Sequence, residues 1–405
     1  MGLAKAYRAG THRSVAPEET IRRAWRLAPI MGITRIGNVT GLDVVGVPVV
    51  TVIRPNARSL AVAQGKGLTL AAAKASGLME SVESYHAETI TLPLRYCSLN
   101  ELRYAQRVVD PSQWPAVATS SFHPNLRLLW CEGRDLMDGG PAFVPFELVH
   151  TDYTWPQPAG SGCFAASSNG LASGNHLLEA ISHAICEVVE RDANSLWMLR
   201  QPGDRESQQL DLSTIDDAAC REVIGKFEAA GLEVSAWDMT TDTGIASFYC
   251  VIFHAADDPT RWLPPAAGAG CHPSRAIALL RALTEAAQTR LVMISGSRDD
   301  VGRASYARHR YGGVLDELRA HAGRPGPRNF RDAPDCDADT FEDDVAWLLT
   351  RLREAGVNHV VAIDLTKDAF KLPVVRVVIA GLEGPHEVPG YVAGARAQAM
   401  MAARS

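Results

Sequence analysis

Residues 167–197 read SSNGLASGNHLLEAISHAICEVVERDANSLW, and the interpretation of the whole chain starts from this stretch. Its turn-rich start, Asn169-Gly170 and Gly174-Asn175, predicts a helix that begins with an asparagine cap. On a 3.6-residue period, apolar positions gather on one side of this helix and polar positions on the other. The apolar side holds Ile181, Ile185, Val188 and Val189, and the polar stripe holds His183, Glu187, Glu190 and Asn194. Two carboxylates therefore share one face of the predicted helix.

Two other segments repeat this arrangement. The segment GKGLTLAAAKASGLMESVE, residues 65–83, predicts a helix from about Thr69 to Glu88 after a glycine-containing loop. A third helix is expected to begin near Ser274, after another glycine-containing loop, and to run past residue 290. The polar stripes are Ser76, Glu80 and Glu83 on the second helix and Arg281, Glu285 and Gln288 on the third. Three helices thus each present acidic or amide groups three residues apart.

β-Branched runs predict strands between these helices. Residues 32–56 predict two strands joined by a turn near Leu42-Asp43, and residues 234–255 predict a hairpin that turns at Thr241 to Gly244. Residues 358–366 and 373–384 predict two more apolar strands, and residues 344–356 an amphipathic helix. The chain therefore combines sheets with helices.

The composition is that of an ordinary globular protein. The chain has 405 residues, 46% of them hydrophobic, which is enough for one large core or two smaller ones. With 40 Lys and Arg against 46 Asp and Glu, the formal net charge is −6, which excludes an overall positive field for nucleic acid or anionic lipid. The chain contains no apolar run of membrane-spanning length and no secretory signal. We therefore expect a cytoplasmic protein with no nucleic-acid or membrane partner.

The eight cysteines are scattered singly, without zinc-type spacing, so buried free thiols are expected. Cys163 is a candidate nucleophile, but no Cys-His signature lies near it, and a buried thiol is the favoured alternative.

Carboxylates brought together on three helices repel one another and raise one another's pKa, so they need protons or cations between them. Mg²⁺ suits this task because it takes oxygen ligands and commonly binds one or two carboxylates together with substrate phosphates. Cationic side chains would hold the remaining phosphate oxygens. The candidates are Lys5, Arg8, Arg13, Lys66, Arg191 and Arg290. The residues therefore predict a magnesium–nucleotide site.

Alternatives remain open at this point. Any single stripe is also typical of a solvated helix face with i to i+4 ion pairs, although the central stripe contains no lysine. His183 and Asn194 are equally compatible with a buried hydrogen-bond network. The basic segment KAYRAGTHR, residues 5–13, suits phosphate oxygens but is also typical of a solvated terminus. No GxxxxGK[ST] loop or kinase-type motif is present, so the type of nucleotide fold stays undefined.

The chain nevertheless resembles the YcaO-domain family. The matching elements are SNGLASGN and HAICEVVERDA within 168–193, GKGLTLAAAKASGLMESVE at 65–83, GAGCHPSRAIALLRALTEAAQTRL at 268–291, ISGSRDD at 294–300, and DLT followed by PVVRVVIAGLEG within 364–384. They occur in the order of the family and span roughly residues 5 to 385.

This resemblance implies an α/β fold of the α+β type, with mixed β-sheets and packed helices, three of which line a Mg-ATP site. It implies a single catalytic domain over residues 1–385 and a C-terminal tail over 386–405. The implied metal ligands are Glu80, Glu83, Glu187, Glu190 and Glu285. The implied nucleotide contacts are Lys5, Arg8, Ser76, Asn169, Asn175 and Arg191, with Gln288 and Arg290 nearby. Among these, we expect Glu187, Glu190 and Arg191 to act in catalysis.

The chain departs from the family at two positions. Where the family often reads S-x-x-x-E-x-x-E-R, Ser84 follows Glu83, and His183 stands in place of the second serine. The glutamates are unaffected by these departures.

The resemblance also implies a reaction. YcaO proteins activate a peptide-bond amide: a nucleophile adds to the carbonyl, ATP phosphorylates the oxygen, and loss of phosphate leaves an azoline after side-chain attack or a thioamide after attack by sulfide. Residues 386–405 contain no PxPxP motif, which azoline-forming members commonly carry at their C-terminus, and we expect no added leader-binding domain at the N-terminus. The chain is therefore more similar to members that work with a TfuA partner and are linked to thioamidation.

We accordingly expect ATP and Mg²⁺ as cofactors, a peptide or protein substrate, and a TfuA-like or leader-binding partner. Thioamide formation is the favoured reaction, and azoline formation by a cyclodehydratase is the first alternative. A non-catalytic ATP-binding scaffold, a purely structural helix-rich protein and a homodimeric assembly are further possibilities.

Overall fold

Helices are interspersed with strands along the chain. The computed structural model describes residues 2–255, 262–307, 311–321 and 323–403. The helices are α1 (Pro17–Trp25), α2 (Ala28–Met31), α3 (Leu70–Glu88), α4 (Leu99–Leu102), α5 (Leu177–Met198), α6 (Pro202–Glu206), α7 (Ala218–Ala229), α8 (Arg275–Ser295), α9 (Gly312–His321), α10 (Phe341–Glu354) and α11 (Ala395–Ala402). The strands are β1 (Arg35–Asn38), β2 (Val49–Ile53), β3 (Val62–Lys66), β4 (Leu94–Ser98), β5 (Arg127–Asp135), β6 (Pro141–Pro145), β7 (Leu171–Ser173), β8 (Leu210–Asp211), β9 (Glu233–Asp238), β10 (Ser247–Phe253), β11 (Ala266–Cys271), β12 (Arg328–Asn329), β13 (Val360–Asp364) and β14 (Val374–Ile379).

The strands form several separate sheets. A six-stranded sheet has the order β4-β5-β13-β14-β7, with β6 paired to β5, and its ladders are antiparallel. Two antiparallel sheets have the orders β1-β2-β3 and β11-β10-β9, whereas β8 and β12 form a short parallel pair. Sheets of this kind with packed helices confirm the predicted α+β fold class.

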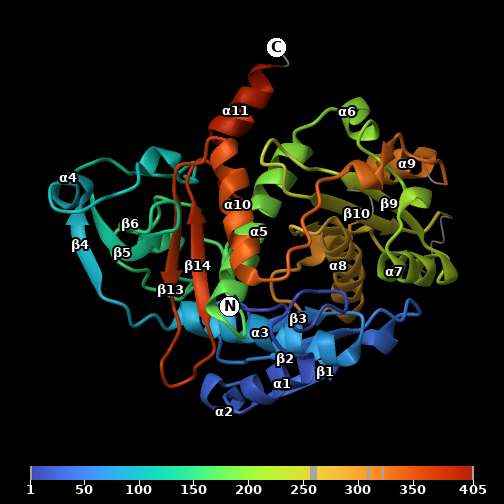
Figure 1. The fold of residues 1–405 in the computed structure, drawn as a ribbon, viewed down its shortest axis with the longest axis horizontal. Coiled ribbons are helices and arrows are strands. Elements are labelled where there is room, and N and C mark those ends of the chain that lie inside the picture. The colour runs from blue at the N-terminus through green and yellow to red at the C-terminus, as the bar shows by residue number, and fades with distance from the viewer. Residues whose placement is uncertain (1, 256–261, 308–310, 322, 404–405) are drawn as a thin grey trace.

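Helix α5 runs through the middle of the molecule (Figure 1). The six-stranded sheet lies on one side of it, the β9–β11 sheet with α7 and α8 lies on the other, and α1, α3 and the β1–β3 sheet lie below. Separate cores form between α3 and the six-stranded sheet, beneath α7 and α8, and between α5, α10, β13 and β14. The elements that carry the three predicted stripes therefore meet at the centre.

Each stripe-bearing helix follows a sheet-edge strand after a three-residue loop. Residues 67–69 join β3 to α3, residues 174–176 join β7 to α5, and residues 272–274 join β11 to α8. Strands β3, β7 and β11 each stand at the end of their sheet. The helices thus begin next to strand edges whose N–H groups have no neighbouring strand to pair with.

The predicted asparagine cap of α5 is wrong, although the helix itself is confirmed. His176 caps the helix by accepting a hydrogen bond from the Leu178 N–H at 3.2 Å. Asn175 instead donates from its amide nitrogen to Thr20 Oγ1 at 2.9 Å, which ties this loop to α1. The predicted apolar side is confirmed, because Ile181, Ile185, Val188 and Val189 are all buried.

The strands predicted from β-branched runs are also confirmed. β1 and β2 pair around a short turn at Thr40–Leu42, and β9 and β10 form the hairpin that turns at Thr241 to Gly244. Near the C-terminus, the Glu383 carboxylate accepts from the N–H groups of Gly394 and Ala397 at 2.9 Å each, which fastens α11 to the body.

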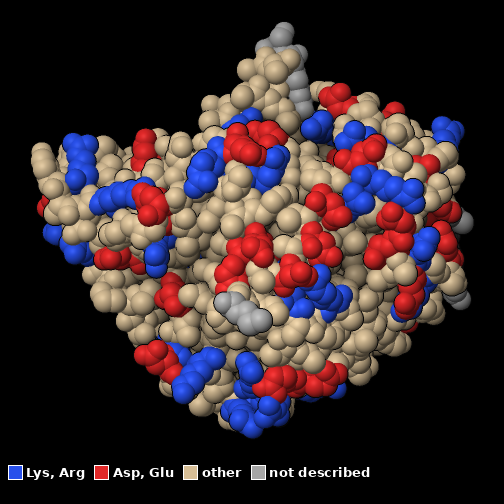
Figure 2. Space-filling model, viewed as in Figure 1, with Lys and Arg blue, Asp and Glu red and all other residues tan. Residues whose placement is uncertain are grey.

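None of the helices in the described residues combines the length and apolarity needed to cross a membrane. On the face shown in Figure 2, acidic and basic side chains are interspersed, as the small net charge leads one to expect.

Glycines allow the strands and helices of these units to pack closely. A Cβ added at Gly65 in β3 would lie 2.0 Å from Ala73 O and 2.3 Å from Gly77 N of α3. A Cβ at Gly268 in β11 would lie 2.3 Å from Ala282 O of α8. In both cases the obstacle is helix backbone, which cannot rotate away.

Gly65→Ala should lower the free energy of unfolding, by about 1–3 kcal/mol, because β3 and α3 would have to separate. Gly225→Ala is the matched control: Gly225 lies in α7 with no atom within 4 Å of an added Cβ, so alanine there should stabilise by about 0.5–1 kcal/mol. Urea denaturation of both variants measures the difference. Equal stabilities would show that β3 and α3 are not packed as closely as described.

Candidate active site

A cavity of about 680 Å³ lies where the three strand–helix units meet. Its volume falls within the ~300–1,000 Å³ typical of small-molecule sites. The predicted residues in its lining are Arg13, Lys66, Ser76, Glu80, Glu83, Asn175, Glu187, Glu190, Arg191, Glu285 and Gln288. The polar stripes of α3, α5 and α8 therefore face one common space rather than bulk solvent.

Backbone N–H groups of the three edge strands hold four of these carboxylates. Gln64 of β3 donates to Glu80 at 3.3 Å, and Ser173 of β7 donates to Glu83 at 2.8 Å. From β11, Cys271 donates to Glu190 at 3.1 Å and Ala269 donates to Glu285 at 3.5 Å. The carboxylates thus satisfy edge N–H groups and are themselves fixed in position.

Burial dominates the electrostatics of the glutamates. Burial, with a smaller contribution from neighbouring carboxylates, raises the pKa of Glu80 to about 7, that of Glu83 to about 8 and that of Glu187 to about 7. Burial raises the pKa of Glu190 as well. These groups bind protons near neutral pH unless a cation replaces the protons.

Cationic side chains lie among the glutamates. The Lys66 ammonium pairs with Glu285, and although burial alone would raise the pKa of Glu285, Lys66 and Arg191 lower it. Arg191 lies 3.8 Å from Glu190. Burial lowers the pKa of Arg191, but Glu190, Glu285 and Glu187 outweigh this and raise it, so the guanidinium stays charged.

This donor set fits Mg²⁺ and a phosphate group. Hard carboxylate oxygens come from three different helices, and burial raises the pKa of Glu80, Glu83 and Glu187, so that a bound cation would favour their ionised form. Asn175 Oδ1 and Arg281 Nε are buried side-chain atoms without a hydrogen-bond partner among the described residues, and both residues line the cavity. A polar ligand would satisfy these atoms.

Four predicted nucleotide contacts lie outside the cavity lining. The Lys5 ammonium is buried in an ion pair with Asp344 at 2.8 Å, and Arg8 pairs with Asp337 and Asp339 at 2.9 Å each. Arg290 pairs with Asp43 at 2.6 Å. Asn169 lines a small separate pocket. Lys5, Arg8 and Arg290 thus pair with carboxylates outside the cavity lining, and Asn169 lies in a different pocket. The geometry therefore gives no support to their predicted contacts with the nucleotide.

Several cavity residues were not assigned a role from the sequence. Glu179 accepts from the N–H and Oγ–H of Ser14, at 3.0 and 2.7 Å. Arg281, Arg298 and His183 also line the cavity. Glu179 lies eight residues before Glu187, and Arg281 lies four residues before Glu285, so both occupy the predicted polar stripes. This helical spacing could have identified them as cavity residues from the sequence. Burial and then Arg281 and Arg13 hold the pKa of His183 well below its usual range, so its ring is neutral.

No cysteine of the described residues lines the cavity, although the Cys271 backbone N–H holds Glu190. All eight are free, and Cys163 is buried, with a pKa that burial raises. A protonated, buried thiol is a poor nucleophile, in agreement with the favoured interpretation of Cys163.

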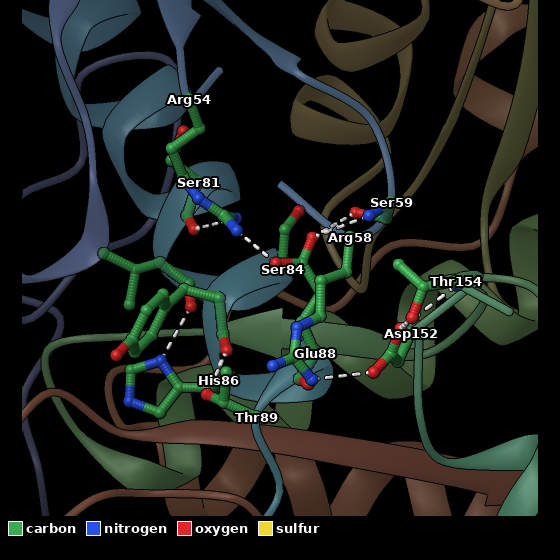
Figure 3. A network of polar contacts seen from close by, with 12 residues as sticks. Arg54, Arg58, Ser59, Ser81, Ser84, His86, Glu88, Thr89, Asp152 and Thr154 are labelled. Carbon is green, nitrogen blue, oxygen red and sulfur yellow. Dashed lines mark hydrogen bonds and ion pairs between the residues drawn. The ribbon is translucent and has the colours of Figure 1, made fainter. Parts of the chain in front are cut away.

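Figure 3 shows a polar network around the end of α3. Glu88 at the end of α3 pairs with the Arg54 guanidinium and accepts from Ser59, while Arg58 pairs with Asp152 at 2.8 Å. Ser59 lines the cavity, and so do Thr151 and Tyr153, the two neighbours of Asp152 in the sequence. The network therefore joins two loops from different parts of the chain into one wall.

The chain is similar in sequence to known proteins. An uncharacterized protein in the tfuA 3′ region of Rhizobium leguminosarum bv. trifolii is 35% identical over 380 residues, which cover 92% of this chain and 88% of that protein. An uncharacterized protein of Methanothermobacter thermautotrophicus is 35% identical over 386 residues, covering 92% of this chain and 95% of that protein.

Two solved structures share the fold. The YcaO protein from Methanopyrus kandleri, bound with AMPPCP and Mg²⁺, has a TM-score of 0.74 at 24% identity, and the match covers 94% of this chain and 95% of that one. A heterocyclase in complex with substrate and cofactor also has a TM-score of 0.74, at 23% identity over 95% of this chain. This chain spans about half of that heterocyclase, 54% of its length.

Residues 64–383 match the family described as YcaO cyclodehydratase, ATP- and Mg²⁺-binding. This match covers the cavity-lining segments of α3, α5 and α8 and confirms ATP and Mg²⁺ as the predicted cofactors. The chain therefore belongs to the YcaO family.

Proposed function

We propose that this protein uses ATP and Mg²⁺ to activate a backbone amide of a peptide or protein substrate by O-phosphorylation, and that the product is a thioamide. The observation that carries the proposal is the convergence of Glu80, Glu83, Glu187, Glu190 and Glu285 on one cavity. Bound MgATP supplies the phosphoryl group that turns the amide oxygen into a leaving group. Sulfide adds to the amide carbon, the oxygen leaves as phosphate, and a C=S bond replaces C=O.

The residues of the cavity have separable tasks in this reaction. The glutamates provide oxygen ligands for Mg²⁺, and edge-strand N–H groups keep Glu190 and Glu83 in position. Arg191, whose charge the surrounding carboxylates maintain, stabilises negative charge on the transferring phosphoryl group. Arg13 and Lys66 line the same cavity and bind phosphate oxygens. Catalysis then rests on positioning and electrostatics, with little covalent chemistry from the protein.

Thioamide formation is favoured by the relative encoded in the tfuA 3′ region, which matches 92% of this chain. We propose on this basis a TfuA-like partner protein that delivers or assists the sulfur nucleophile. Azoline formation is the second candidate, because the matching family is described as cyclodehydratases and the fold is shared with a heterocyclase. In that reaction a Cys, Ser or Thr side chain of the substrate attacks instead of sulfide.

Glu190→Gln should abolish ATP turnover and strongly weaken MgATP binding without unfolding the protein. The amide oxygen of glutamine can still accept a hydrogen bond from the Cys271 N–H, but the substitution removes one negative charge from the proposed metal site. Thermal unfolding with and without MgATP measures binding. Nucleotide at 100 times Kd should stabilise the wild type by about 2.7 kcal/mol and the variant far less.

Glu228→Gln is the matched control, because Glu228 is exposed on α7, away from the cavity. It should keep full ATP binding and turnover. Undiminished turnover in Glu190→Gln would remove this residue from the metal site, and a wild type that binds MgATP but never consumes it would favour a non-catalytic scaffold.

The reaction itself is distinguished by the mass of the peptide product. Replacing oxygen by sulfur raises the mass, whereas loss of water on azoline formation lowers it. Intact-mass measurement of candidate peptides after incubation with MgATP, sulfide and a TfuA-like protein should give the mass increase. A decrease that is independent of sulfide would identify the protein as a cyclodehydratase.

A substrate peptide with heavy oxygen in its amide carbonyls tests the activation step. The label should appear in the released phosphate in either reaction, and it should be absent with Glu190→Gln. Product formation without labelled phosphate would contradict O-phosphorylation.

A further inference from the structure

Three distant segments bring His12, His272 and Asp344 together. His12 belongs to the N-terminal segment that precedes α1, His272 to the β11–α8 loop, and Asp344 to α10. Each residue offers one ligand atom, and these atoms all lie within 4.8 Å of one another. His12 is 5% exposed and Asp344 is 0% exposed. None of the three lines the nucleotide cavity.

Two polar atoms of this cluster are buried without a hydrogen-bond partner among the described residues. They are Nδ1 of His12 and Oδ2 of Asp344. The other oxygen of Asp344 accepts from the Lys5 ammonium at 2.8 Å, so the carboxylate is oriented with one oxygen left over. Unpaired buried acceptors are costly, which points to an occupant that the polypeptide does not supply.

The surroundings resemble the second shell of a metal site. The other ring nitrogen of His12, Nε2, lies 3.5 Å from Asp337 Oδ1, and a carboxylate behind a histidine is the usual support of a metal-binding imidazole. Burial and the nearby Lys5 lower the pKa of His12 to about 4, and burial together with His12 and Arg281 holds that of His272 well below its usual range. Both rings are therefore neutral at physiological pH, as ligation requires.

Two features oppose a cation here. The first is the local positive charge: Lys5 pairs with Asp344, Arg8 pairs with Asp337, and Arg13 and Arg281 lie near enough to lower the pKa of His272. The second is a hydrogen bond that His272 already accepts. The Ser274 N–H donates to His272 Nδ1 at 3.0 Å, and ligation through either ring nitrogen of His272 would end this bond. Ser274 would then lose one hydrogen bond at the start of α8.

We propose that His12, His272 and Asp344 bind a divalent transition-metal ion of the zinc type. Two imidazoles and one carboxylate suit Zn²⁺, with water in the fourth position, and nitrogen ligands disfavour Mg²⁺. The ion fastens the N-terminal segment to α10 and to the end of β11. That segment lines the nucleotide cavity through Gly10, Thr11 and Arg13, so the metal site supports one wall of the cavity from behind.

Zn²⁺ titration of the metal-free full chain tests this site directly. Excess Mg²⁺ in the buffer occupies the carboxylates of the nucleotide cavity, and the wild type should then bind one equivalent of Zn²⁺. Co²⁺ in place of Zn²⁺ should give the visible absorption of a site with nitrogen ligands. Zn²⁺ should also raise the Tm of the wild type. Absence of stoichiometric binding by the wild type would overturn the proposal and leave a water-filled polar cluster.

Variants locate the ion. His272→Ala and His12→Ala should each lose the bound equivalent and the Tm shift, and Asp337→Asn should weaken Zn²⁺ binding by about 10–100-fold, as expected for a residue behind a ligand. His123→Ala, which removes an exposed histidine elsewhere, and Glu187→Gln, which alters the nucleotide cavity, should keep it. Binding that survives in the His12→Ala, His272→Ala double variant would place the ion elsewhere and contradict the assignment. The wild-type titration decides the matter if a variant fails to fold.

Discussion

Hydrogen bonds from sheet-edge N–H groups to helix carboxylates are the interaction on which this structure depends. An edge strand leaves half of its N–H groups without a partner, and in most proteins solvent or a covering segment satisfies them. Here Gln64, Ser173, Ala269 and Cys271 donate to glutamates of α3, α5 and α8. Two of these bonds link a strand to the helix of another unit: Ser173 precedes α5 but binds Glu83 of α3, and Cys271 precedes α8 but binds Glu190 of α5. The three units are thereby joined through the residues that line the cavity.

This arrangement concentrates negative charge in a buried place, and its cost explains the chemistry that the cavity can support. Each edge N–H favours the ionised carboxylate, yet burial prevails and raises the pKa of Glu80 and Glu83 above that of a solvated glutamate. Burial also raises the pKa of Glu187, which has no such N–H partner in the described part of the chain. The protein's own cations compensate only in part: Lys66 lowers the pKa of Glu285, and Arg191 lies beside Glu190. A divalent cation that replaces protons between the remaining carboxylates stabilises the folded state and creates a phosphate-binding site at the same time.

The sequence predicted the parts of this site that follow from local periodicity. A stripe at i, i+3 and i+4 places side chains on one helix face whatever the tertiary structure, so the faces of α3, α5 and α8 were recognisable. Partners that are distant in sequence leave no such trace. Lys5 was predicted to contact phosphate, but its partner Asp344 lies 339 residues away, and Arg290 pairs with Asp43 across 247 residues. Glu179 and Arg281 occupied recognisable stripe positions. The hydrogen bonds from edge-strand N–H groups to the glutamates could not be predicted, because they depend on the order of the strands in each sheet.

The ion pairs of the N-terminal cations show how the basic segment at residues 5–13 is attached to the rest of the protein. Lys5 and Arg8 attach it to acids before and within α10, while Arg13 alone among its three predicted contacts lines the cavity. Ser14 and Arg13 then meet Glu179 of α5, so the segment crosses from α10 to the first turn of the central helix. These contacts hold the segment against α10 and α5, next to the cavity that Gly10 and Thr11 line. The ring of His12 contacts the ring of His272, which directly follows β11. The last residue of β11, Cys271, donates to Glu190, a predicted Mg²⁺ ligand. The end of β11 therefore positions both the N-terminal segment and this glutamate.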